Sequence, residues 1–86
     1  MKEASLTQRL IIFNRQNPNH NELELINTQR RTLVGDGYGQ ISSRRARALA
    51  MCKLATIYHT KFGRALELTT KGSLSLDQST EEFLSL

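Results

Sequence analysis

The first apolar pattern of the chain has the spacing of a helix. Its apolar residues share one helical face: Leu6, Leu10 and Phe13. Ser5 and Gln8 fit a capping box, in which each residue bonds to a free backbone N–H of the other. Pro18 stops the pattern, because the residue before a proline is pushed out of the helical region. The pattern therefore predicts a helix over residues 6–16.

A second pattern, over residues 22–34, supports two interpretations. Asn19 with Glu22 repeats the capping signal, and Gly35 would end a helix. The apolar positions that would share the helical face are Leu23, Ile26 and Leu33. The alternation of Leu23 and Leu25 with glutamates is instead typical of a hairpin. We favour the helix, and the hairpin stays open. The glycine-rich stretch "GDGYGQIS" that follows matches no phosphate-binding loop and is predicted to be a connection.

The strongest helical pattern begins at Ser42 or Ser43 and runs to about Phe62, with Gly63 ending it. One broad apolar arc contains Ala48, Met51, Cys52, Leu54, Ala55, Tyr58 and Phe62. This pattern predicts a central helix. It also predicts that Cys52 lies in the core as a small apolar residue.

After Gly63 the period changes from helical to alternating. The alternating leucines are Leu66 and Leu68, then Leu74 and Leu76. Lys71 and Gly72 lie between the two runs, so a hairpin is predicted with Gly72 at its turn. Ser79 and Glu82 form another capping signal, which predicts a short terminal helix.

The predicted order is helix, helix, helix, hairpin, short helix. It describes a mainly α fold with a small β-hairpin, an α+β class, in a single domain over residues 1–86. This order is compatible with a winged-helix-like arrangement. The segments "LTQRLIIF" and "LELTTKG" resemble first-helix and wing segments of winged-helix DNA-binding domains. The resemblance implies that the third helix enters the DNA major groove. The connection before that helix is longer than the usual turn of about 3 to 4 residues.

Composition indicates how large a core the chain can form and in which cellular compartment we expect it. At 86 residues, of which 38 % are hydrophobic, it can bury only a small core. That favours a homodimer, or a chain that folds firmly on a partner. Cys52 is the single cysteine, so no internal disulfide can form. The apolar run Leu10–Phe13 is shorter than the roughly 7 to 15 residues of a secretory signal or the roughly 20 of a membrane span. We expect a cytoplasmic protein without a membrane segment.

Charge divides the chain into three parts. The net charge is +4, but residues 1–28 sum to zero, residues 29–64 to +7 and residues 65–86 to −3. An arginine cluster lies where the third helix is expected to begin. Because free N–H groups already make a helix N-terminus positive, arginines there call for a compensating anion. The candidate anion-binding residues are Arg30, Arg31, Ser42, Ser43, Arg44, Arg45, Arg47 and Lys71.

Two partners fit such a cluster. The first is nucleic acid, with duplex DNA preferred because few aromatic residues are available for stacking on unpaired bases. The protein would then be a regulatory nucleic-acid-binding protein. The second is an acidic protein surface, docked by a small adaptor or inhibitor. The acidic residues Asp77, Glu81 and Glu82 could also fold back and neutralise the arginines within the chain.

The sequence offers no catalytic constellation. His20 and His59 are its two histidines, and Cys52 lies too far from His59 for a Cys–His couple if both share one helix. No motif with metal-ligand spacing is present. We expect no enzyme activity, no cofactor and no metal.

Overall fold

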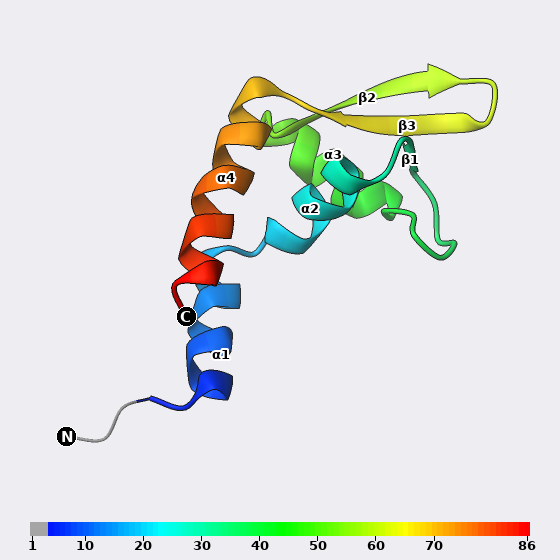
Figure 1. Ribbon diagram of the computed structural model, residues 1–86. Coiled ribbons are helices and arrows are strands. Elements are labelled where there is room, and N and C mark those ends of the chain that lie inside the picture. The colour runs from blue at the N-terminus through cyan, green and yellow to red at the C-terminus, as the bar shows by residue number, and fades with distance from the viewer. Residues whose placement is uncertain (1–3) are drawn as a thin grey trace.

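The computed structural model describes residues 4–86, and this part of the chain folds into four helices and a three-stranded antiparallel sheet (Figure 1). The elements in chain order are α1 (Leu6–Gln16), α2 (His20–Thr28), β1 (Thr32–Leu33), α3 (Ser43–Met51), β2 (Ala55–Thr60), β3 (Gly63–Leu68) and α4 (Thr70–Leu84). The predicted α+β class is confirmed, whereas several of the predicted element boundaries are wrong.

Helix α1 forms as its sequence predicts. The Ser5 Oγ accepts a hydrogen bond from the Gln8 N–H at 3.2 Å, and the Gln8 side chain accepts one from the Ser5 N–H at 3.0 Å. Asn17 ends the helix, and its N–H donates to the Phe13 carbonyl. Both ends of the helix are therefore determined by local sequence, without help from the core.

Helix α2 confirms the helical interpretation of this region but is shorter than predicted. It buries Leu23 and Ile26 and ends at Thr28, so the expected C-cap at Gly35 is wrong. Thr32 and Leu33 instead form β1 against β3. The β-branched Thr32 suits a strand, and at 1 % exposure it is packed inside the molecule. The hairpin alternative for Leu23 and Leu25 is wrong as well.

The predicted central helix is in fact a helix followed by a strand. Helix α3 ends at Met51, Lys53 takes a left-handed φ of 60°, and β2 begins at Ala55. Strand β2 contains Thr56, Ile57, Tyr58 and Thr60, which are β-branched or aromatic residues that fit a pleated sheet. Cys52 lies at the end of α3 and is exposed, so its predicted place in the core is wrong.

The hairpin lies earlier in the chain than predicted. Strands β2 and β3 pair from Ala55 opposite Leu68 to Thr60 opposite Gly63, and Gly63 takes the positive φ of 118° that the turn requires. Gly72 is no turn residue: it lies in the first turn of α4 and is buried. Ser79 is buried in the middle of the same helix, so the predicted start of a short helix there is also wrong.

The core lies between the sheet and helices α2, α3 and α4. The sheet order is β1-β3-β2, which makes β3 the central strand. The residues of the main buried cluster are Leu23, Ile26, Ile41, Ala46, Leu49, Leu54, Ala55, Leu66 and Leu76. Helix α1 contributes none of them. Its one buried residue, Phe13, packs edge-on against His20 and Phe83.

The described chain is elongated because α1 extends away from this core (Figure 1). Its dimensions are 56 × 25 × 22 Å and its radius of gyration is 14.4 Å. A compact domain of this length would have a radius of gyration of about 12 Å. Helix α1 therefore behaves as an arm on a small compact body.

The N-terminus of α4 is fixed by close contact with the turn between α3 and β2. A Cβ atom at Gly72 would overlap the Leu54 carbonyl oxygen. Gly72→Ala should therefore destabilise the protein by about 2 to 3 kcal/mol, although alanine favours a helix over glycine by about 1 kcal/mol. Chemical denaturation measures this loss.

Ser73→Ala is the matched control, because Ser73 is the next residue of the same helix and is exposed. It should be neutral or slightly stabilising. If Gly72→Ala were as stable as Ser73→Ala, the close approach of the two backbones would be refuted.

Candidate nucleic-acid interface

Helix α3 presents a basic outer face. Ser42 is its N-cap, and the Ser42 Oγ accepts a hydrogen bond from the Arg45 N–H at 3.2 Å. Ala46 and Leu49 turn inward and are buried, whereas Arg44 and Arg47 are exposed. Arg44 and Arg47 are three residues apart, so their side chains project from neighbouring positions on the helix surface.

Arg45 differs from these arginines because a carboxylate of the same chain compensates its charge. Its Nε lies 3.1 and 3.0 Å from the two Glu22 carboxylate oxygens, and its Nη2 lies 2.7 Å from Glu22 Oε1. Nη2 also donates to Asn19 Oδ1 at 2.7 Å. The hydrogen bonds with Glu22 raise the pKa of the Arg45 guanidinium above its ordinary value, partial burial opposes this shift, and the negative charge of Glu22 adds to it.

The β2–β3 hairpin brings further cations beside the start of α3. The Arg64 Nη2 on β3 donates to the Ser43 Oγ at 3.2 Å. This bond ties the central strand to the first turn of α3, so the hairpin and the basic helix face adjoin each other.

An exposed aromatic ring with two cations lies at the hairpin tip. Phe62 is 57 % exposed. The Arg31 guanidinium carbon lies 4.7 Å from the centroid of its ring, and the Lys61 ammonium lies 5.3 Å from it. Both distances are typical of cation–π contacts. Arg31 precedes β1, so this contact also joins the β1 edge of the sheet to the hairpin tip.

The structure thus groups only part of the predicted residue set. Arg31, Ser43, Arg44 and Arg47 lie on α3 or toward the hairpin. Lys71 is at the opposite end of α3, where its Nζ donates to the Cys52 carbonyl at 3.1 Å. The residues at the hairpin that the predicted set omitted are Lys61, Phe62 and Arg64. Lys61 and Arg64 belong to the basic middle segment of the sequence. The helical pattern, however, places Lys61 within a helix and predicts the hairpin turn about ten residues later than it lies.

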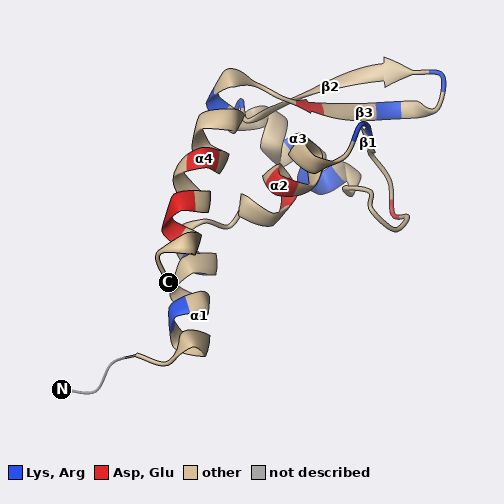
Figure 2. Ribbon diagram, in the orientation of Figure 1, with Lys and Arg blue, Asp and Glu red and all other residues tan. Residues whose placement is uncertain are grey.

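Figure 2 shows how the charges separate in space. Basic residues lie on the hairpin, on α3 and next to β1, and others lie on α1 and at the start of α4. The acidic residues of α4 lie away from the hairpin and α3. In the part of the chain that the structure describes, Arg45 pairs with Glu22 and with no residue of α4. The acidic end of the chain is therefore not the internal partner of the arginine cluster in this structure.

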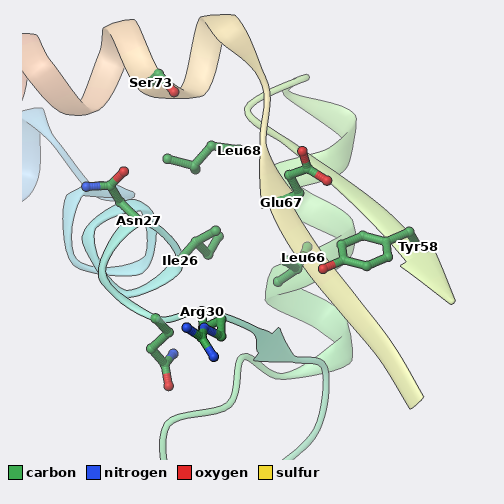
Figure 3. A pocket seen from close by; sticks show the side chains of 9 residues that line it. Ile26, Asn27, Arg30, Tyr58, Leu66, Glu67, Leu68 and Ser73 are labelled. Carbon is green, nitrogen blue, oxygen red and sulfur yellow. The ribbon is translucent and has the colours of Figure 1, made fainter. Parts of the chain in front are cut away.

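Arg30 lines a separate groove of about 420 Å³ between α2, the hairpin strands and α4 (Figure 3). The groove is lined by Ile26, Asn27, Gln29, Arg30, Tyr58, Leu66, Glu67, Leu68 and Ser73. Glu67 places a negative charge at this groove, which makes it a poorer site for a phosphate than the outer face of α3.

A buried serine, a buried histidine and an exposed glutamate also form a hydrogen-bonded series. The His20 Nδ1 lies 2.7 Å from Ser79 Oγ, and its Nε2 lies 3.2 Å from a carboxylate oxygen of Glu24. Nucleophilic hydrolases use such a series. Ser79, however, is 4 % exposed and donates to the Leu76 carbonyl, so a substrate could not reach its hydroxyl. The arrangement joins α2 to α4 and is structural.

Residues 4–86 contain no group of three or more histidine, cysteine or acidic side chains arranged to hold a metal ion. None of the helices in this range combines the length and the apolar character needed to cross a bilayer. Comparison with family models, curated proteins and solved structures found no match to the chain.

The pair between Arg45 and Glu22 joins α2 to α3 and can be measured by a double-mutant cycle. Arg45→Ala and Glu22→Ala should show a coupling free energy of about 1 kcal/mol, because the pair is multiply hydrogen-bonded but partly open to water. Urea denaturation of the wild type, both single variants and the double variant gives this value.

Arg44→Ala replaces Arg45→Ala in the control cycle. Its coupling to Glu22 should be below about 0.3 kcal/mol, because Arg44 points outward. Equal coupling in the two cycles would contradict the specific pairing of Arg45.

Proposed function

We propose that this protein binds duplex DNA, without catalysing a reaction, through the outer face of α3 and the tip of the β2–β3 hairpin. One observation carries the proposal: five cations and an exposed phenylalanine lie on one helix face, on the adjoining hairpin and just before β1, where Arg31 contacts the hairpin tip. The residues of this basic face are Arg31, Arg44, Arg47, Lys61, Phe62 and Arg64, and Ser43 adds a hydroxyl at the start of α3.

The arrangement of elements supports this proposal. Helix α3 buries one side and leaves the arginine side free, and a helix of about 10 to 12 Å diameter fits the major groove. The hairpin follows α3 in the chain and adjoins its N-terminus through Arg64 and Ser43. A helix followed by a wing-like hairpin is the geometry that the resemblance to winged-helix domains implies.

Each part of the basic face has a chemical role in this proposal. Arg44 and Arg47 bond to phosphate oxygens, for which the forked guanidinium is well suited. Lys61 and Arg64 contact the backbone beside the groove that α3 occupies. Phe62 packs against sugars or base edges, and its flanking cations stay close to the phosphates. The acidic end of α4 lies away from this face, so it does not repel the DNA.

Binding should depend steeply on salt. Five cation–phosphate contacts give a slope of about −4 to −5 for log K against log salt concentration. Arg44→Gln with Arg47→Gln should make the slope shallower by about 2 and weaken binding at least roughly tenfold at low salt. Fluorescence anisotropy with a labelled duplex at several salt concentrations measures both quantities.

Lys53→Gln with Lys71→Gln is the charge-matched control. It removes the same charge at the far end of α3, and it should change the affinity less than about threefold. If the two double variants weakened binding equally, net charge alone would explain it. Absence of binding to any duplex at low salt would refute the proposal and leave an acidic protein surface as the partner for this face.

The aromatic ring at the tip should contribute separately from the charges. Phe62→Ala should weaken duplex binding by about 1 to 2 kcal/mol and leave the salt slope unchanged, because no phosphate contact is lost. The same anisotropy titrations distinguish the two effects. Tyr38→Ala removes another exposed aromatic residue, in the glycine-rich loop, and should leave binding unchanged. A loss as large for Tyr38→Ala would show that Phe62 has no specific role.

A further inference from the structure

Helix α1 lacks the packing that a short helix ordinarily needs. It has 11 residues, and isolated helices shorter than about 12 to 15 residues are marginal in water. Phe13 is its single buried residue, in contact with His20 and Phe83. The rest of the arm extends from the body into solvent (Figure 1).

The exposed residues of α1 are nevertheless apolar on more than one side. Leu6 is 57 % exposed on the Phe13 side, whereas Ile11 and Ile12, at 47 % and 50 % exposure, point away from that side. A shallow apolar hollow on that side is lined by Ala4, Gln8, Ile11 and Ile12. Large apolar side chains on two sides of a short helix are normally covered by other elements or by a partner.

Helix α4 carries a second exposed stripe. Leu76, Ser79 and Phe83 follow one another on the side that packs inward. The stripe on the other side consists of Leu74, Asp77, Glu81 and Leu84, which recur at helical spacing and are exposed. Leu74 and Leu84 are 60 % and 77 % exposed.

The charges on α1 and on the exposed α4 stripe are of opposite sign. Helix α1 contains Arg9 and Arg15 and no acidic residue, whereas the α4 stripe contains Asp77 and Glu81. Within residues 4–86 none of these four makes an ion pair. Each copy of the chain therefore offers one basic apolar helix and one acidic apolar helix stripe, both without a partner.

We propose that two copies of this chain associate as a two-fold symmetric dimer in which α1 of each copy packs on the exposed stripe of α4 in the other. Two-fold symmetry repeats this contact, so α1 and the α4 stripe are covered in both copies. Burial of Ile11 and Ile12 supplies the apolar contact, and Arg15, which lies between them on the helix surface, faces the acids of the second copy. Arg9 adds to the positive charge of the same helix. Because each contact surface is small, we expect a dissociation constant in the micromolar range.

Sedimentation equilibrium over about 5 to 500 µM, a range that brackets a micromolar constant, tests the proposal with the full chain. The mass should rise from 9.8 kDa toward twice that value. Ile11→Gln with Ile12→Gln should raise the dissociation constant at least about tenfold, and Met51→Gln, an exposed apolar residue of α3, should leave it unchanged. Thermal melting of each variant confirms that it is folded.

Charge exchange identifies the pairing of the helices. In the variant Arg9→Glu/Arg15→Glu, both α1 and the α4 stripe are acidic. In the variant Asp77→Lys/Glu81→Lys, both are basic. Each alone should be monomeric, and an equimolar mixture should dimerise, because both contacts of the mixed dimer are complementary. A monomer throughout the concentration range would overturn the proposal, as would a dimer unaffected by the isoleucine substitutions or a mixture that stays monomeric.

Discussion

The fold depends on the contact between the first turn of α4 and the turn that joins α3 to β2. The Thr69 N–H donates to the Leu54 carbonyl, its hydroxyl donates to the Lys53 carbonyl, and Gly72 lies against Leu54. Lys71 adds a bond to the Cys52 carbonyl. These backbone contacts set the direction of α4 and place Leu76 in the core. They also fix the end of the hairpin, because β3 ends one residue before Thr69.

The arginines of α3 differ in whether a carboxylate of the same chain compensates their charge. Glu22 holds Arg45 against α2, while Arg44 and Arg47 on the same helix keep their charges outward. Neighbouring arginines in the sequence thus have different tasks: one joins two helices and the others are available to a partner. The exposed phenylalanine at the hairpin tip extends the basic surface in a way that charge counting cannot reveal.

Local signals in the sequence were sufficient for α1 and for the α+β class. The capping box at Ser5 and the proline after α1 act within a few residues, so they could be read directly. The segment from Ala55 to Thr60 could not be predicted in this way, because its apolar spacing also fits a helix. It forms a strand because it pairs with β3. The role of Gly72 could not be predicted for a similar reason. Only glycine fits there because the backbone of Leu54, which is distant in sequence, leaves no room for a side chain. For the candidate site, the arginine cluster could be located, but the internal pairing of Arg45 and the grouping with Phe62 depend on tertiary contacts.

The sheet order β1-β3-β2 determines when the sheet can form during synthesis on the ribosome. The central strand is the last of the three to be synthesised, and β1 pairs with it across a long separation, Thr32 with Leu66. No part of the sheet can therefore be completed before residue 68 has left the exit tunnel. Until then the nascent chain exposes the apolar residues of α1, α2 and α3 without a sheet to cover them. The late arrival of β3 makes the burial of this core a nearly single event, which follows the synthesis of the first three helices.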